Sequence, residues 1–271
     1  MTGTTTSIYG PLGMLWRKAW LETRGRFFGG LALSLIVGFG VIYDFRATER
    51  LLPLIRNIDP ATLDTSGPIG GAIKESIAAQ QTFRGFVWWQ WYRQNLTYLV
   101  VVFSALLGAG GLLARSGGAT LFTLSLPVSR NRLIGMRAAI GLAELLTIAV
   151  VPSLVLPLLA PTIGQSYRVI DVIVHGACMF IVGSVFFSLA ALLSNDYADT
   201  WRPVLIACIV AAALGMLEYI PAIAPFGIFH VMNGETYYRH AGLPWIGLLV
   251  SGGISAALLR TAAINLAHRD F

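Results

Sequence analysis

Apolar residues are gathered into six runs along the chain, separated by segments that hold most of the arginines. Each run is about as long as the stretch of about 20 residues with which a helix crosses a bilayer. The pattern therefore predicts an all-α integral membrane protein, a single domain over residues 1–271 with six transmembrane helices. The predicted spans are residues 27–43, 96–114, 138–159, 172–193, 203–220 and 244–266.

Two segments outside these runs have patterns of their own. In residues 11–26, Leu12, Leu15, Trp16, Ala19 and Trp20 fall on one helical stripe, which predicts an amphipathic helix in the membrane interface. A longer first helix is the alternative. Residues 44–95 form a long extracytoplasmic insertion, in which the aromatic stretch 82–94 is expected to anchor at the outer headgroups.

The short segment between the second and third spans differs from an ordinary loop. A helix-competent stretch, ATLFTLSL at 119–126, is stopped by Pro127, because residues before proline avoid the α region. Ser129 can cap the next helix. The apolar side chains of the stretch need a partner, which is either lipid or a soluble protein.

Composition supports a membrane protein: 56% of the residues are hydrophobic and 12% are charged. Soluble domains carry roughly 25% charged residues. The net charge of +6 is assigned to arginines facing anionic lipid headgroups and not to nucleic acid. With six spans both termini share a side, and 11 of the 19 basic residues fall there. The positive-inside rule predicts a multi-pass protein of the cytoplasmic (inner) membrane with both termini cytoplasmic.

Catalytic and metal-binding motifs are missing from the sequence. Lys74 lies in a glycine-rich stretch but is flanked by Ile73 and Glu75, so the phosphate-loop pattern is not met. No histidine pair has the spacing of a zinc peptidase, and no metal site is expected. The chain is expected not to be an enzyme and to hold no cofactor of its own.

Two acids fall inside the predicted spans. Glu144 lies in the third span and Glu218 near the outer end of the fifth. Ionisable groups at this depth are costly and usually face a bundle interior or a watery path. Each is a candidate for a translocation path, with an interhelical hydrogen bond as the alternative and, for Glu218, a position at headgroup level.

The stretch ATLFTLSLPVSRNRLIGMR resembles the coupling segment of the permease subunits of ABC transporters, specifically the type-2 exporter family. The opening WRKAWLETRGRF, the segment PAIAPFGIFHVMNGE and the final AAINLAHRDF are similar to other parts of that family. The chain departs from the family at Ser116, Gly117 and Gly118, where acidic residues are usual.

The resemblance implies a permease subunit that moves its substrate, by export, across the cytoplasmic membrane. It implies a cytoplasmic ABC ATPase partner, which holds ATP and Mg²⁺, and a second permease subunit in a homo- or heterodimer. A cytoplasmic coupling helix and broken outer helices between spans five and six follow from it, with Pro221 and Pro225 as a candidate gate. The residues expected to contact the ATPase are Thr120, Leu121, Phe122, Leu124, Leu126, Pro127, Ser129 and Arg130.

Other functions remain open from the residues alone. A secondary transporter or channel driven by an ion gradient would use Glu144 as a proton relay. A non-transporting membrane partner would use an ABC-type ATPase for mechanical work. The substrate is not specified by the sequence.

Overall fold

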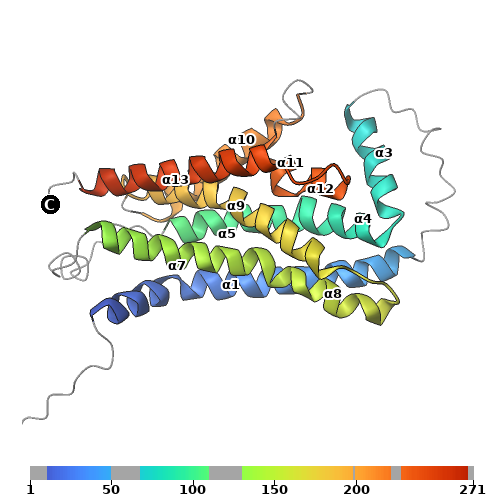
Figure 1. Ribbon diagram of the computed structural model, residues 1–271, viewed down its shortest axis with the longest axis horizontal. Coiled ribbons are helices and arrows are strands. Elements are labelled where there is room, and N and C mark those ends of the chain that lie inside the picture. The colour runs from blue at the N-terminus through green and yellow to red at the C-terminus, as the bar shows by residue number, and fades with distance from the viewer. Residues whose placement is uncertain (1–10, 50–67, 110–129, 198, 221–226, 268–271) are drawn as a thin grey trace, which may run out of the picture.

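The computed structural model describes residues 11–49, 68–109, 130–197, 199–220 and 227–267. Every regular element among these residues is a helix. The long helices run side by side along the long axis of the molecule (Figure 1). The structure thus confirms the predicted all-α class.

Four helices are long and apolar enough to cross a membrane, at Ala19–Glu49, Ile134–Ile163, Val169–Leu193 and Trp245–Asn265. They belong to α1 (Pro11–Glu49), to α7 (Arg130–Val150) with its continuation, to α9 (Val169–Leu193) and to α13 (Trp245–Ala267). By their length and composition, these helices indicate a multi-pass membrane protein. The other two predicted spans fall on shorter apolar helices, α5 (Thr97–Gly108) and α10 (Trp201–Leu217).

The first helix is longer than the sequence predicted. Pro11–Glu49 forms one helix, so residues 11–26 continue into the span and are not a separate element. The alternative of a longer first helix therefore describes this part of the chain better. Trp16 and Trp20, which the pattern placed on the apolar stripe, are both exposed on the protein surface.

The helix at the second predicted span begins earlier than the apolar run of the sequence. α4 (Phe83–Val87) leads into η1 (Trp88–Leu96), a π-helical stretch that continues into α5. Side chains cap carbonyls in this stretch: Thr97 Oγ1 donates to the Tyr92 carbonyl at 2.6 Å, and Asn95 Nδ2 to the Gln90 carbonyl at 2.7 Å. The turn of a π-helix is wider than that of an α-helix, and these side-chain hydrogen bonds supply donors to its backbone carbonyls.

The aromatic side chains of this stretch point into the protein. Trp88, Trp91 and Tyr92 are almost completely buried, and Trp91 Nε1 donates a 2.8 Å hydrogen bond to Ser153 Oγ. The prediction that the stretch anchors in the outer headgroups is wrong for these three residues. Their large apolar area stabilises the bundle from inside, and α3 (Pro68–Gln80) packs against α4 beside them.

The third predicted span is bent where its prolines fall. α7 ends at Val150, and the short helices η2 (Pro152–Leu154), α8 (Val155–Leu159) and η3 (Ala160–Ile163) continue it. Proline removes a backbone donor and disfavours the α conformation before it, which explains the break. The left-handed Gly164 closes the last turn.

The centre of the bundle is α9, which α5, α7, α10, α11 and α13 all contact. Glycines let the neighbouring backbones approach it: a side chain at Gly108 on α5 would lie 2.2 Å from the Phe187 carbonyl of α9. Ser188 of α9 and Ser255 of α13 are joined by a 2.7 Å hydrogen bond. Small residues and interhelical hydroxyl bonds are typical of helix packing in membranes.

The two ends of the bundle carry different elements. The starts of α1 and α7 and the last turn of α13 lie at one end, whereas α3, α8 and α12 lie at the other (Figure 1). Two short helices, α11 (Ile228–Met232) and α12 (Glu235–Tyr238), occupy the segment between α10 and α13 where broken helices were predicted.

Candidate functional site

The residues predicted to contact an ATPase lie outside the described part of the chain. This holds for Thr120, Leu121, Phe122, Leu124, Leu126, Pro127 and Ser129, and the side chain of Arg130 is also not described. Pro221 and Pro225, the candidate gate, lie outside it as well. Of the predicted site residues, the structure therefore places Glu144 and Glu218.

Glu144 is buried where α7 packs against α1. Its side chain is 2% exposed, and its Oε1 accepts a 2.5 Å hydrogen bond from Thr23 Oγ1. The second oxygen, Oε2, has no hydrogen-bond partner among the described residues. The alternative of an interhelical hydrogen bond is thus observed for one of the two carboxyl oxygens, Oε1.

Two arginines near Glu144 join the helices that surround it. Arg137 Nη2 lies 3.3 Å from Glu22 Oε2 and joins α7 to α1. Arg26 Nη1 donates a 2.8 Å hydrogen bond to the Leu106 carbonyl of α5. These contacts hold α1, α5 and α7 in a fixed arrangement around the buried acid.

The same acid lines a groove of about 430 Å³ between α1 and α7. Aromatic and aliphatic side chains form its walls. The lining residues are Trp16, Arg17, Trp20, Phe27, Ile140, Ala143, Glu144 and Thr147.

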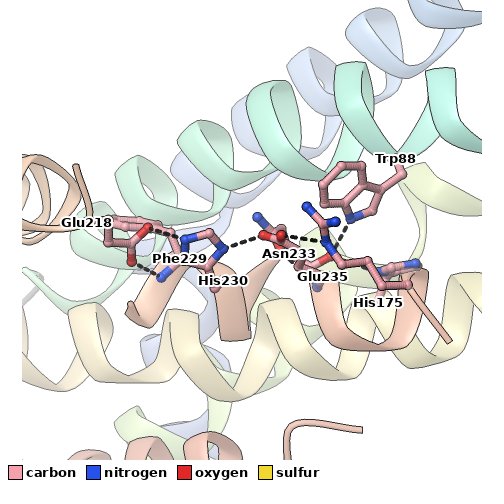
Figure 2. A network of polar contacts seen from close by, with 8 residues as sticks. Trp88, His175, Glu218, Phe229, His230, Asn233 and Glu235 are labelled. Carbon is pink, nitrogen blue, oxygen red and sulfur yellow. Dashed lines mark hydrogen bonds and ion pairs between the residues drawn. The ribbon is translucent and has the colours of Figure 1, made fainter. Parts of the chain in front are cut away.

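Glu218 belongs to a different site, at the end of α10. Its Oε1 accepts a 2.6 Å hydrogen bond from the Phe229 backbone N–H, at the start of α11. His230 Nε2 lies 3.9 Å from its other oxygen. The carboxyl group therefore ties α10 to α11 (Figure 2), as the alternative of an interhelical contact expects. Its place on a translocation path stays a prediction.

His230 continues this chain of contacts to α12. Its Nδ1 is hydrogen-bonded to Glu235 Oε2, and Arg239 Nε donates to Glu235 Oε1 at 2.8 Å. The bond to Glu235 is the main reason that the pKa of His230 is raised. Burial alone would raise the pKa of Glu235, but the bond from His230 and the charges of His230 and Arg239 outweigh it and lower that pKa to about 2. Both shifts favour the charged forms of the two groups, the imidazolium of His230 and the carboxylate of Glu235.

A second group of contacts meets at Asn233. Its carbonyl oxygen accepts hydrogen bonds from Trp88 Nε1 at 3.2 Å and from His175 Nδ1 at 2.9 Å (Figure 2). Because a carbonyl can only accept, His175 carries its proton on Nδ1 in this arrangement. The Asn233 side chain accepts from the Glu235 backbone N–H at 3.0 Å and begins α12. One residue thereby joins η1, α9 and α12.

Asp171, at the start of α9, holds the outer face of the cluster. Its Oδ1 accepts a 2.8 Å hydrogen bond from Tyr237, and Arg84 Nε lies 3.5 Å from its Oδ2. Arg84 Nη1 also donates to His240 Nε2 at 3.0 Å. Burial and the bond to Asp171 raise the pKa of Tyr237, so its hydroxyl stays protonated and keeps donating.

Sequence reasoning missed most of this second cluster. Asp171 and His175 are one helical turn apart at the start of an apolar run, a spacing that places both on one face. This spacing was the only local pattern that could have indicated a polar cluster on that face. The partners Asn233 and Tyr237 lie about 60 residues away in the sequence, and no local pattern connects them to α9.

No group of three or more metal-ligating side chains is arranged to hold an ion in the ranges that the structure describes. His230 and His240, which flank the same short segment, turn to different partners: Glu235 and Arg84. The side-chain contacts in this part of the fold connect neighbouring helices to one another.

Comparison with known proteins gives no relative. No protein-family model matches the sequence, and neither a curated protein nor a solved structure matches the chain.

Proposed function

We propose that this chain is the permease subunit of an ABC transporter of the type-2 exporter family, which exports a substrate across the cytoplasmic membrane. The observation that carries the proposal is the segment 119–132, with its Ser-Leu-Pro-Val-Ser-Arg core between two apolar helices. The all-helical bundle and its apolar helices are compatible with it.

The proposal includes six spans, which adds two helices to the four long ones. α10 is apolar over 17 residues, and the helical run through α4, η1 and α5 covers Phe83–Gly108. A run of 26 residues is about 39 Å long, enough to cross the hydrocarbon core. The starts of α1 and α7 and the end of α13 share one end of the bundle (Figure 1), which is compatible with six spans. The positive-inside rule supports the proposal that this end faces the cytoplasm.

ATP is hydrolysed by a separate ATPase subunit of this transporter. Two permease subunits pair, and two cytoplasmic ATPase subunits bind the segment around Ala119–Arg132. ATP-driven closure biases the permease only through contacts that differ between its two states, and this segment supplies them. The path runs along the interface between the permease subunits, with α5 and α10 beside it and Pro221 and Pro225 in its outer gate.

Co-purification with the ATPase tests the proposal. The chain alone should hydrolyse no ATP, and it should retain a Walker-motif ATPase in mild detergent. Leu126→Asp and Pro127→Gly should release this ATPase and stop transport. Ala241→Asp, which adds the same charge in the exposed turn before α13, serves as the matched control and should change neither. Full ATPase binding and transport in both coupling variants would refute the proposal.

One observation favours a second candidate, a transporter driven by a proton gradient. Thr23 has a single hydroxyl hydrogen, which can go to Glu144 Oε1 at 2.5 Å or to the Ala19 carbonyl at 3.3 Å. The hydrogen bond between Thr23 and Glu144 Oε1 can therefore form with Glu144 either ionised or protonated. Transport that survives ATP depletion but collapses with the proton gradient would select this candidate. ATPase binding without any transported substrate would select a mechanical membrane partner.

A further inference from the structure

The groove between α1 and α7 is lined by a buried carboxyl group, Glu144, one oxygen of which lacks a hydrogen bond among the described residues. Glu144 lies about 15 Å along the apolar span from its start at Ile134. A carboxylate at such depth is costly, and a buried oxygen without a hydrogen bond adds to the cost. Thr23 satisfies Oε1, but Oε2 has no partner in the part of the chain that the structure describes. The charge of Arg26 acts on Glu144, but Oε2 still lacks a hydrogen-bond donor, and a ligand that donates from a positive centre would supply one.

A second acceptor lies on the same helix face as Glu144. Thr147 follows Glu144 by three residues and lines the same groove. Its hydroxyl hydrogen is already donated to the Ala143 carbonyl at 2.8 Å, so its oxygen has only acceptor capacity left. A group that donates several hydrogens from one positive centre fits both oxygens, and a primary ammonium is such a group.

The rest of the groove fits an apolar or aromatic body. Trp16 and Trp20 are 47% and 36% exposed, and Trp20 packs on Phe27 with ring centroids 5.4 Å apart. Phe27 and Ile140 form a buried floor. Exposed indole faces bind flat apolar groups and attract cations.

We infer that the α1–α7 groove binds a lipophilic primary amine, with its ammonium group on Glu144 Oε2 and Thr147 Oγ1 and its apolar body along Trp20 and Trp16. The chemistry separates this ligand from its closest competitors. A quaternary ammonium has no hydrogen to donate, and a neutral alcohol has no charge to offset that of the carboxylate. Binding at this groove goes beyond the proposed transport function and does not require the ATPase.

The amine lies deeper than the headgroups of a bilayer lipid. Glu144 contacts Thr23, whereas Arg17 is six residues, or about 9 Å, closer to the start of α1. An ethanolamine phospholipid places its ammonium outside its phosphate, which is the reverse of this order. The arrangement therefore favours a free amphipathic amine that has partitioned into the membrane.

Binding of a fluorescent probe tests the inference. The probe is a primary decylamine with a dansyl group at its far end, added to the purified chain in nanodiscs of choline phospholipid. Energy transfer from tryptophan reports binding above the signal from empty nanodiscs. The trimethylammonium and hydroxyl versions of the probe should bind at least about tenfold more weakly, as expected when a charge-assisted hydrogen bond is lost. Ethanolamine phospholipid in the nanodisc should not displace the amine.

Variants locate the site. Glu144→Gln keeps an acceptor for Thr23 but removes the charge, and it should weaken binding of the primary amine about tenfold or more. Ala143→Leu fills the groove without changing any charge and should weaken all three probes. Glu218→Gln removes a half-buried acid elsewhere and should leave binding unchanged. Equal affinity of Glu144→Gln and the unaltered chain, or equal binding of the primary and quaternary probes, would overturn the inference, and so would full binding in Ala143→Leu.

Discussion

His230 on α11 and Glu235 on α12 are hydrogen-bonded to each other across the turn that separates the two short helices. Glu218, also facing His230, extends the contact to the end of α10. Three carboxylate and imidazole groups therefore hold the connection between α10 and α13 in one shape, and their ionisation governs how firmly it is held.

Stability should depend on pH through this pair. The groups facing His230 are Glu218, Glu235 and Arg93, and the net effect raises the pKa of His230. The stabilising contribution of a raised histidine is complete below its unfolded pKa of about 6.5 and is lost as pH rises through the folded value. The pKa of Glu235 is lowered to about 2, so its contribution to the free energy of unfolding is complete above about pH 4.5. This contribution is lost as the pH falls toward 2.

We therefore expect His230→Gln to destabilise the protein most between pH 4.5 and 6.5, by about 2 kcal/mol, and much less at pH 9. Thermal unfolding of both proteins across this range measures the difference. Arg239→Gln removes the exposed partner of Glu235 and should show no such change between pH 6 and 9. A His230→Gln penalty that is equal at pH 5.5 and pH 9 would contradict the assignment.

Gly234 should not tolerate a side chain. Its φ is +65°, and a Cβ there would lie 2.7 Å from His175 Nδ1, the atom that donates to the Asn233 carbonyl. Gly234→Ala should destabilise by about 1–3 kcal/mol more than backbone strain alone. Gly164→Ala isolates the strain, because its φ of +70° is similar and nothing lies within 4 Å of the added Cβ. Equal melting temperatures of the two variants would show that the contact with His175 is unimportant.

The approach of α5 to α9 should depend on Gly108. A Cβ at this position would lie 2.2 Å from the Phe187 carbonyl, so Gly108→Ala forces the two helices apart. We expect a loss of about 3 kcal/mol or more, measured by denaturation in detergent. Gly253→Ala on α13 adds the same methyl where nothing lies within 4 Å, and it should be neutral or slightly stabilising. A stable Gly108→Ala would mean that the helices are packed less closely.

The hydrogen bond between Trp91 and Ser153 should be measurable by a double-mutant cycle. Both side chains are fully buried, and their bond joins η1 to η2. Trp91→Phe leaves Ser153 Oγ without this donor, which costs about 1–3 kcal/mol in addition to the lost area. In the Ser153→Ala background the same change should cost less, because no acceptor is then left unpaired. Additive losses in the double variant would refute the coupling.

The apolar runs predicted the helices well because a segment in the membrane must hydrogen-bond its own backbone, which requires a helix long enough to cross the bilayer. Val169–Leu193 and Trp245–Ala267 begin and end within three residues of the predicted spans. The aromatic stretch around Trp91 was misjudged, because interfacial anchors and buried aromatic residues have the same composition. Whether Trp91 is buried depends on the helix that carries Ser153, which is distant in the sequence. A local sequence pattern does not show where that helix lies.

Glu144 shows the same limit at the candidate site. Its depth in an apolar helix marked it as unusual, which the sequence alone could establish. Its partner, Thr23, is 121 residues away, and the groove depends on how α1 lies against α7. The cluster at Asn233 was invisible for a related reason, since two of its hydrogen bonds use a backbone carbonyl that every residue possesses.

The central place of α9 has a consequence for biosynthesis. The ribosome completes α1, α5 and α7 before it makes the helix on which α5 and α7 pack. The glycine-lined faces of these earlier helices, around Gly108 and Gly141, must therefore remain in contact with lipid or the insertion machinery until α9 arrives. The contacts among α1, α5 and α7 can form earlier, but the packing around α9 is completed only after translation has passed Leu193.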